Sequence, residues 1–356
     1  MPIALRRRLS AAGKEADGVY YAQLSVGTPP RNFSAILDTG SRVAALPCAA
    51  CAHCGARHAR FDPANSSTAA LGAPYSQCYA EGSCNRGTLV SDIVCLDGAC
   101  GRADFGCCTV YSLAFQRQEA DGIAGRELFG EAFALALTPE GGEVRLGPPP
   151  PEGVVWAAMD PDGSVSASAL AVGNVSVALG GLAALVDTGT SFVYLPASAF
   201  ARVREAFAAL EAAVPGESMY CTRAALERFP VLRYVLDGGA SISQAPGEYF
   251  YEAAPGVRCV GIFADRRMVL GASALVNQHV YFAPGRFGVG EPAPATGAPT
   301  FGPTGSPTHT PEAGYWAWMH AGLVALLVLC AAVGGLAWVG ESALEEAEDE
   351  ELTVLL

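Results

Sequence analysis

Residues 35–41 read AILDTGS, and residues 184–190 repeat the pattern as ALVDTGT. In each copy, three apolar residues precede an aspartate, and a Thr-Gly pair and a hydroxyl residue follow it. A single Asp-Thr-Gly is weak evidence, because aspartate and glycine are common turn residues. Two copies with matching flanks are far more specific and indicate an internal repeat. The repeat sets Asp38 and Asp187 at equivalent positions, each at the end of an apolar strand.

The repeated turns suit chemistry that needs two carboxylates side by side. Two such turns related by a pseudo-twofold axis would bring Asp38 and Asp187 together, and carboxyl groups that close share one proton. One member then acts as general base on a water, while the protonated member donates to the carbonyl oxygen of a peptide bond. We therefore predict both aspartates to be catalytic, with no metal and no cofactor. Turn capping alone would leave the repeated hydroxyl residues unexplained.

Further motifs, in the same order along the chain, resemble those of pepsin-type aspartic peptidases. They are the first strand at 21–30, the flap motif at 79–83 with 87–89, the apolar-glycine segments at 121–125 and 269–272, and the carboxyl-lobe segments at 229–232 and 247–249. The resemblance covers about Tyr20 to Gly290. It implies a mainly β, two-lobed pepsin-like aspartic protease fold and aspartic-type endopeptidase activity on peptide or protein substrates.

The resemblance implies supporting roles for the residues of the two turns, which are Thr39, Gly40, Ser41, Thr188, Gly189 and Thr190. The two threonines should hydrogen-bond across the dyad and hold its loops in register. The hydroxyl residues that follow the glycines should donate to the outer carboxylate oxygens, which favours the ionised form and an acidic working range.

The resemblance also implies a flap over the substrate, with Tyr79 as its tyrosine and Glu81 and Gly82 at its tip. Tyr79 should close over bound peptide and exclude water from the scissile bond. We hypothesise that Glu81 pairs with a basic substrate residue on the non-prime side; an exposed carboxylate without a partner is the alternative. Ala45 stands where pepsin-type enzymes usually carry a cleft tryptophan, so the flap tyrosine is expected to lack its usual partner.

A cysteine-rich insert narrows the resemblance within the family. Residues 47–68 resemble the nepenthesin-related branch, and residues 79–83 and 91–94, with the membrane anchor predicted below, resemble its plasmepsin V-type members. Those members are processing proteases of the secretory pathway. Two alternatives on the same fold are a non-catalytic binding or inhibitor protein and a degradative protease of an acidic vacuole. Retention of both aspartates, both loop threonines and the flap tyrosine argues against the first alternative.

The twelve cysteines indicate an oxidising compartment, since nine of them lie between residues 48 and 108. Cys48, Cys51 and Cys54, with two histidines nearby, also have a spacing that a zinc site permits. Disulfides are favoured over zinc, because six more cysteines lie close by. Nine is an odd number, so at least one amino-lobe cysteine should be free or paired elsewhere.

The carboxyl-terminal region predicts a membrane anchor. Residues 315–340 contain no Asp, Glu, Lys or Arg, and tryptophans lie near both ends, as in a helix that spans a bilayer. A buried core helix is the alternative, but a Pro/Thr/Gly-rich segment precedes these residues and a charged segment follows them. We predict a stalk at 291–314, a single transmembrane helix at 315–340 and an acidic cytosolic tail at 341–356.

The disulfides orient this helix, because they require the large amino-terminal part to be lumenal. The prediction is a single-pass type I membrane protein of the endomembrane system (endoplasmic reticulum, Golgi, endosome or vacuole) with a lumenal catalytic part. Glycosylation sequons at Asn32, Asn65 and Asn174 fit a secretory route.

The tail carries a second candidate motif. Glu351 lies four positions before Leu355 and Leu356, which resembles a dileucine sorting signal bound by a vesicle-coat adaptor. A solvated acidic tail with an apolar end fits the same residues equally well.

The remaining boundaries follow from composition. Residues 1–18 contain three arginines but no apolar run, so a signal peptide is missing and we predict an N-terminal remnant or propeptide-like segment. We predict an amino lobe at 19–150, a carboxyl lobe at 151–290 and, within it, one clear helix at 198–214, where apolar residues recur at helical spacing. The net charge of −13 argues against nucleic-acid binding.

Overall fold

Most of the described structure consists of β-strands, in which apolar residues alternate with more polar ones. In β2 (Tyr20–Val26), every second side chain is buried and those between are half-buried or exposed. Apolar residues alternate at 20–26 and 33–37, a pattern that predicts strands, and the structure confirms them as β2 and β3 (Arg31–Asp38). The computed structural model describes residues 2–7, 18–55, 58–79, 82–112, 115–116, 118–147, 152–211, 221–223 and 225–290.

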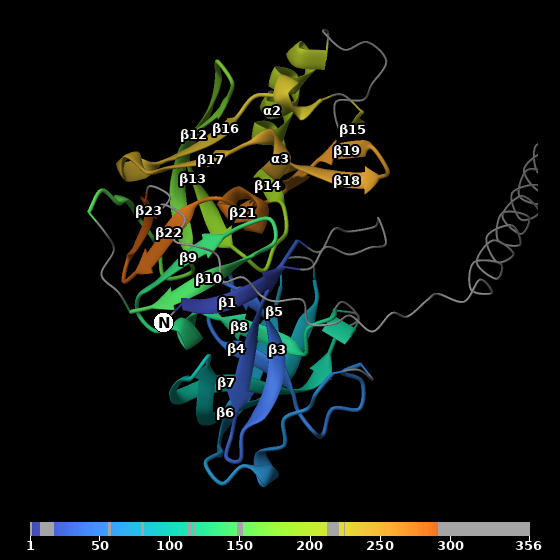
Figure 1. The fold of residues 1–356 in the computed structure, drawn as a ribbon, viewed down its shortest axis with the longest axis vertical. Coiled ribbons are helices and arrows are strands. Elements are labelled where there is room, and N and C mark those ends of the chain that lie inside the picture. The colour runs from blue at the N-terminus through green and yellow to red at the C-terminus, as the bar shows by residue number, and fades with distance from the viewer. Residues whose placement is uncertain are drawn as a thin grey trace, which may run out of the picture. The chain divides into compact units, whose positions relative to one another are not determined.

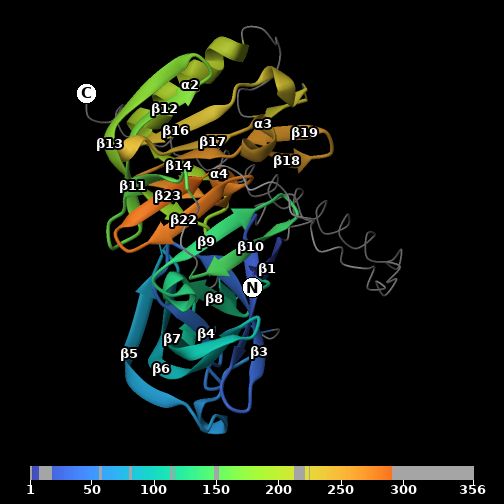
Figure 2. The same cartoon turned by 60° about the vertical axis from the view of Figure 1, so that its left-hand side comes forward.

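The larger sheet continues from one lobe into the other (Figure 1). Among the described residues it has thirteen strands, in the spatial order β11 (Val155–Ala158), β23 (Arg286–Gly290), β22 (His279–Ala283), β9 (Phe133–Leu137), β10 (Gly141–Leu146), β1 (Pro2–Arg7), β2, β3, β8 (Gly122–Gly125), β4 (Ala44–Pro47), β7 (Ala99–Tyr111), β6 (Cys84–Leu96) and β5 (Ala70–Cys78). Figure 2 shows β5 at the outer edge of this sheet. The pairing of β9 with β22 joins the lobes and is reinforced by stacked rings of Phe133 and Phe282, whose centroids are 4.6 Å apart.

The carboxyl lobe has its own sheets and short helices. In the part of the chain described, the larger sheet of this lobe has the order β17 (Ser241–Gln244), β16 (Leu232–Leu236), β12 (Ser164–Val172), β13 (Val175–Asp187), β21 (Met268–Gly271), β14 (Val193–Pro196) and β20 (Ile262–Asp265). A smaller sheet contains β15 (Cys221–Thr222), β19 (Val257–Val260) and β18 (Phe250–Ala254). The helices are α2 (Ala197–Glu211), α3 (Pro246–Tyr249) and α4 (Ala272–Leu275), with 3₁₀ turns at η1 (Pro63–Asn65), η2 (Arg126–Phe129), η3 (Leu226–Arg228) and η4 (Asp237–Gly239).

The helix predicted at 198–214 is confirmed as α2 up to Glu211. Val203 and Phe207, one turn apart, are buried on the face that packs against the sheet. Val214 lies outside the described residues.

The two aspartate turns belong to one strand arrangement that occurs twice. β3 runs parallel to β8, with Asp38 opposite Gly125, and β13 runs parallel to β21, with Asp187 opposite Gly271. In both lobes the next strand, β4 or β14, returns antiparallel to the glycine strand. Both glycines are required, because a Cβ at Gly125 would lie 2.6 Å from the Val43 carbonyl carbon and one at Gly271 would lie 2.0 Å from a carbonyl oxygen.

The amino-terminal residues take part in this architecture. Pro2–Arg7, inside the segment predicted as a remnant or propeptide-like piece, form β1 between β10 and β2. Ile3 and Leu5 are buried in the core cluster that extends through both lobes. These residues therefore complete the large sheet.

Disulfides account for ten cysteines, as the sequence predicts. The pairs are Cys48–Cys107, Cys51–Cys54, Cys78–Cys84, Cys95–Cys100 and Cys221–Cys259. The three cysteines of the alternative zinc site are all paired, so they offer no thiolate ligands. The expected unpaired amino-lobe cysteine is Cys108, which is buried.

Within the described ranges, no helix is long and apolar enough to span a membrane. The stalk at 291–314, the helix at 315–340 and the tail at 341–356 lie outside those ranges.

Candidate active site

The strand repeat brings the two Asp-Thr-Gly turns together at the junction of the lobes. Thr39 and Thr188, both fully buried, interlock the two turns. The Thr39 hydroxyl donates to the Val186 carbonyl oxygen at 2.8 Å, and the Thr188 hydroxyl donates to the Leu37 carbonyl oxygen at 2.7 Å. Each hydroxyl also accepts the opposite threonine's backbone N–H, at 3.1 Å in both directions. Four buried hydrogen bonds thus fix the register of one turn against the other.

The glycines let each turn approach the carboxylate of the other. A Cβ at Gly40 would lie 2.6 Å from Asp187 Cγ, and a Cβ at Gly189 would lie 2.6 Å from Asp38 Cγ. The Gly40 N–H donates to Asp187 Oδ1 at 3.2 Å, and the Gly189 N–H donates to the same oxygen at 2.9 Å. Only glycine fits at these positions.

The hydroxyl residues hold the other carboxylate oxygens. The Ser41 hydroxyl donates to Asp38 Oδ2 at 2.6 Å, and the Ser41 N–H donates to Asp38 Oδ1 at 2.9 Å. On the other side, the Thr190 hydroxyl donates to Asp187 Oδ2 at 2.6 Å. The two hydroxyl bonds of 2.6 Å thus orient one oxygen of each carboxylate in the same way.

The surroundings of Asp38 and Asp187 favour a state in which the two carboxyl groups together keep one proton. Burial raises the pKa of Asp38 well above its usual value, and the charge of Asp187 raises it further. The hydrogen bonds from Ser41 act in the opposite direction and lower this pKa. Because the two carboxyl groups interact closely, the proton belongs to the pair.

The flap motif forms the turn between β5 and β6. The Tyr79 N–H donates to the Ser83 carbonyl oxygen at 2.8 Å, and the Gly82 N–H donates to the Tyr79 carbonyl oxygen at 3.0 Å. Gly82 has a φ of +89°, which suits glycine. Burial raises the pKa of Tyr79, and the charges of Tyr75 and Asp38 raise it further, whereas a hydrogen bond with Ser41 lowers it. Glu81 lies outside the described residues.

Comparison with known proteins agrees with this geometry. Residues 19–133 match the family described as eukaryotic aspartyl protease, and residues 164–285 match the one described as xylanase inhibitor C-terminal. Rhizopuspepsin of Rhizopus chinensis is 26% identical over 313 residues, which cover 76% of this chain and 77% of the relative. The chain is similar to pepsin-like aspartic proteases in both lobes. The family-model match and this relative support the predicted aspartic-type endopeptidase, and the predicted two-lobed, mainly β fold is confirmed.

Other aspartic proteases match smaller parts of the chain. Chymosin of Camelus dromedarius is 27% identical over 252 residues, covering 58% of this chain and 65% of the relative. Aspartic protease 5 of Toxoplasma gondii is 35% identical over 147 residues, covering 30% of this chain and 15% of the relative.

A cluster of aromatic residues beside the flap escaped the sequence analysis. Tyr79 packs against Phe115 with ring centroids 4.9 Å apart, and Phe115 packs against Tyr111 at 5.5 Å. Tyr75 joins the same cluster, together with the small side chain of Ala45. Ala45 was expected to leave the flap tyrosine without its usual family partner, and Phe115 contacts it instead. The positions of Tyr75 and Tyr79, four apart on one strand face, were the available sequence signal.

Arg126 is a second residue near the dyad that the sequence analysis missed. Its guanidinium donates to the Thr39 carbonyl oxygen at 3.4 Å and to the carbonyl oxygen of Pro161 in the carboxyl lobe. Arg126 therefore connects the first dyad turn to the opposite lobe. Burial lowers the pKa of Arg126, and the neighbouring Arg42 lowers it further.

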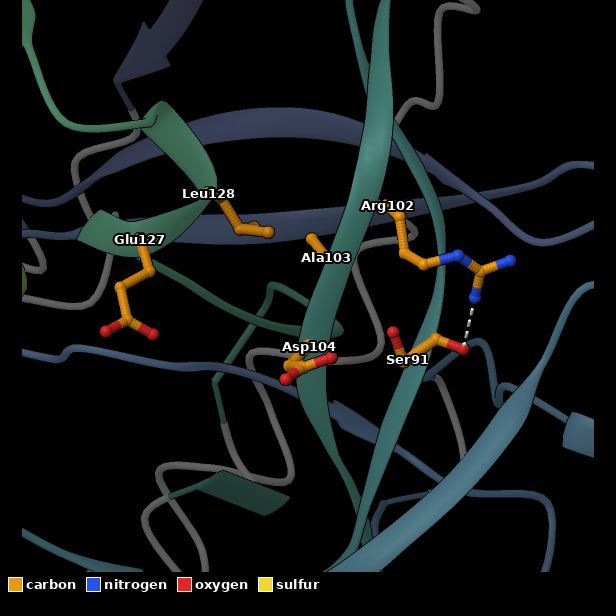
Figure 3. A pocket seen from close by; sticks show the side chains of 6 residues that line it. All are labelled: Ser91, Arg102, Ala103, Asp104, Glu127 and Leu128. Carbon is orange, nitrogen blue, oxygen red and sulfur yellow. Dashed lines mark hydrogen bonds between the residues drawn. The ribbon is translucent and has the colours of Figure 1, made fainter.

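A separate hollow of about 240 Å³ lies on the amino lobe (Figure 3). It is lined by Ser91, Arg102, Ala103, Asp104, Glu127 and Leu128. Arg102 is held at one side by donating to the Ser91 carbonyl oxygen at 3.3 Å. No residue of the dyad or flap lines this hollow, so it is distinct from the candidate active site.

Proposed function

We propose that the protein is a membrane-anchored aspartic endopeptidase of the secretory pathway that processes secretory proteins. Asp38 and Asp187 share one proton and hydrolyse the peptide bond through an activated water. The observation that carries the catalytic assignment is the reciprocal contact of the turns, in which each glycine lies against the opposite carboxylate. An inhibitor or binding protein would not need a dyad with this many oriented donors.

The expected order of events follows from the residues in place. The deprotonated member of the pair takes a proton from the water as it attacks the scissile carbonyl carbon. The protonated member donates to the carbonyl oxygen, so negative charge does not accumulate there. Ser41 and Thr190 keep the outer oxygens in position through hydrogen bonds of 2.6 Å, which leaves the inner oxygens for the reaction. Tyr79 is proposed to cover the bound peptide.

Several observations support the secretory assignment. The five disulfides of the described residues suit an oxidising lumen. The sequon asparagines Asn32, Asn65 and Asn174 are all exposed, so each is accessible to glycosylation. The match to Toxoplasma gondii aspartic protease 5 and the cysteine-rich insert favour the plasmepsin V-type, nepenthesin-related branch. The lumenal orientation, the anchor at 315–340 and adaptor binding at the tail remain parts of this proposal.

The decisive experiment is cleavage of a mixed peptide library by the full-length protein from acidic to neutral pH. Asp38→Asn and Asp187→Asn variants run beside it, and Asp97→Asn, a change in an exposed turn, serves as the matched control. We expect cleavage by wild type and control, and a loss of at least about a thousandfold in both dyad variants. Cleavage that survives in a dyad variant would contradict the catalytic assignment.

A non-catalytic inhibitor or binding protein is the second candidate, favoured by the match of residues 164–285 to the xylanase inhibitor C-terminal family. The library separates the two, because a folded, disulfide-intact protein that cleaves no peptide would support this candidate. Imaging of the tagged protein would separate a processing protease of the endoplasmic reticulum from a degradative protease of the vacuole. If Glu81 contacts basic substrate residues, Glu81→Gln should weaken that preference; an unchanged cleavage pattern would refute the hypothesis.

A further inference from the structure

The flap hairpin is closed by a covalent link at its tip. Cys78, the last residue of β5, is disulfide-bonded to Cys84, the first residue of β6, and the two are register partners. The disulfide encloses only the five residues from 79 to 83, which include the flap tyrosine. Tyr79 is therefore bonded directly to a cross-linked residue.

The Tyr79 side chain packs against the aromatic cluster beside the flap. Its ring packs against Phe115 at 4.9 Å. Its hydroxyl is buried near the hydroxyl groups of Ser41 and Tyr75. The turn itself has two backbone hydrogen bonds, from the N–H groups of Tyr79 and Gly82. The position of the tyrosine therefore depends both on this packing and on the backbone turn that carries it.

The two strands below the turn add little support from the outer side. β5 is an edge strand, and eight of its nine residues are exposed. Its pairing with β6 also shifts register between Leu71 and Pro74. Edge strands that pack few side chains open more readily than central ones. Without the disulfide, the outer arm of the hairpin would be held by its backbone ladder to β6 and by the packing of Tyr75 in the aromatic cluster.

We propose that the Cys78–Cys84 disulfide is a positioning element that holds Tyr79 ready beside the aspartate dyad before substrate binds. The proposal rests on the endopeptidase function proposed above. A pre-ordered flap does not lose its conformational entropy on binding, so the cross-link favours formation of the enzyme–substrate complex. Phe115 supplies the packing surface for the tyrosine ring in this position.

A second disulfide in the same sheet provides a matched control. Cys95 and Cys100 close the turn between β6 and β7 and are also register partners. Their sequence separation is 5, against 6 for Cys78 and Cys84, so the two cross-links close loops of nearly equal length. Loss of either should therefore reduce stability by a similar amount. The control turn contributes no residue to the dyad or the aromatic cluster.

The experiment compares Cys78→Ala/Cys84→Ala with Cys95→Ala/Cys100→Ala in the full-length protein. We expect the flap variant to raise KM about two- to tenfold, with a smaller fall in kcat, because the flap must then become ordered on binding. The control variant should keep both constants within about twofold of wild type while its thermal midpoint falls as much as that of the flap variant. Equal kinetic constants in the two variants would overturn the proposal.

Hydrogen exchange gives a readout that does not depend on catalysis. Amide exchange in residues 75–85 should accelerate in the flap variant and stay unchanged in the control variant. If wild type fails to cleave any peptide, the endopeptidase function is refuted, whereas the exchange data still decide whether the disulfide orders the flap. Unchanged exchange in the flap variant would refute the positioning role even in an active enzyme.

Discussion

Gly40 and Asp187 are in direct contact although 147 residues separate them in the sequence. The Gly40 N–H donates to Asp187 Oδ1 at 3.2 Å, and a Cβ on Gly40 would lie 2.6 Å from Asp187 Cγ. Because Gly40 has no side chain, the Asp187 carboxylate can lie directly against the amino-lobe turn. The reciprocal contact of Gly189 with Asp38 makes the dyad a product of two mutually fitted turns.

Gly40→Ala should therefore displace the Asp187 carboxylate. We expect kcat to fall about a hundredfold, because a misplacement of roughly 1 Å at reacting groups has an effect of that size. Steady-state cleavage of the best library peptide measures it. Gly101→Ala is the matched control, since a Cβ at Gly101 meets no atom within 4 Å. An active Gly40→Ala enzyme would show that the carboxylate has room to adjust.

Thr39→Val should destabilise the protein by about 1–3 kcal/mol, because it leaves the Val186 carbonyl oxygen and the Thr188 N–H without their buried partner. Thr188→Val should cost a similar amount for the same reason. The double variant should cost less than the sum of the two, since the hydroxyls share one network. Urea unfolding measures all three, and Thr109→Val, on an exposed strand position, should change stability by less than about 0.5 kcal/mol. Strict additivity would contradict the interlocked arrangement.

Asp38 should make stability depend on pH with a defined sign. Its pKa is raised in the folded protein, so the folded state binds this proton more tightly than the unfolded chain does. The contribution is fully present below the unfolded pKa of about 4 and is lost as pH rises through the folded value. Urea unfolding of wild type should show the free energy of unfolding falling over that range more steeply than in Asp38→Asn. Asp97→Asn should retain the wild-type slope, and an equal slope in all three proteins would contradict the prediction.

We expect the Cys108 thiol to be unreactive towards alkylating reagents in the native protein. Burial raises the pKa of its thiol to about 12, so almost no thiolate is present at pH 8. Incubation with an alkylating reagent followed by peptide mapping should find Cys108 unmodified in the native protein and fully modified in denaturant. Rapid native labelling would show that the aromatic cluster around this residue opens readily.

The sequence predicted the parts of the fold that depend on local pattern. Alternation from Tyr20 to Val26 indicated a strand, and the repeated Asp-Thr-Gly turns indicated that Asp38 and Asp187 would meet. Both follow from short-range chemistry, which periodicity and turn residues record. The glycine strands that pair with the aspartate strands came from the family resemblance.

Other features depend on contacts between distant residues and left little trace in the sequence. The pairing of Cys48 with Cys107, rather than with its neighbours Cys51 or Cys54, follows from parallel pairing of β4 with β7. The contact of Phe115 with Tyr79 joins separate segments of the chain in one cluster with Ala45, and pattern alone does not indicate it. Strand β1 was missed because its few apolar residues run directly into arginines, so no apolar run marks a strand there.

The place of β1 in the large sheet has a consequence for handling the protein. Pro2–Arg6 pair with Gly141–Arg145 of β10, and Arg6 and Arg7 pair with Tyr21 and Tyr20 of β2. Trimming the chain back to Tyr20 would uncover backbone donors and acceptors on both neighbouring strands at once. Such open edges recruit strands from other molecules, so a shortened enzyme should precipitate or associate where the longer one remains dispersed. Strand β1, which contributes no residue to the dyad, thus protects the protein from self-association.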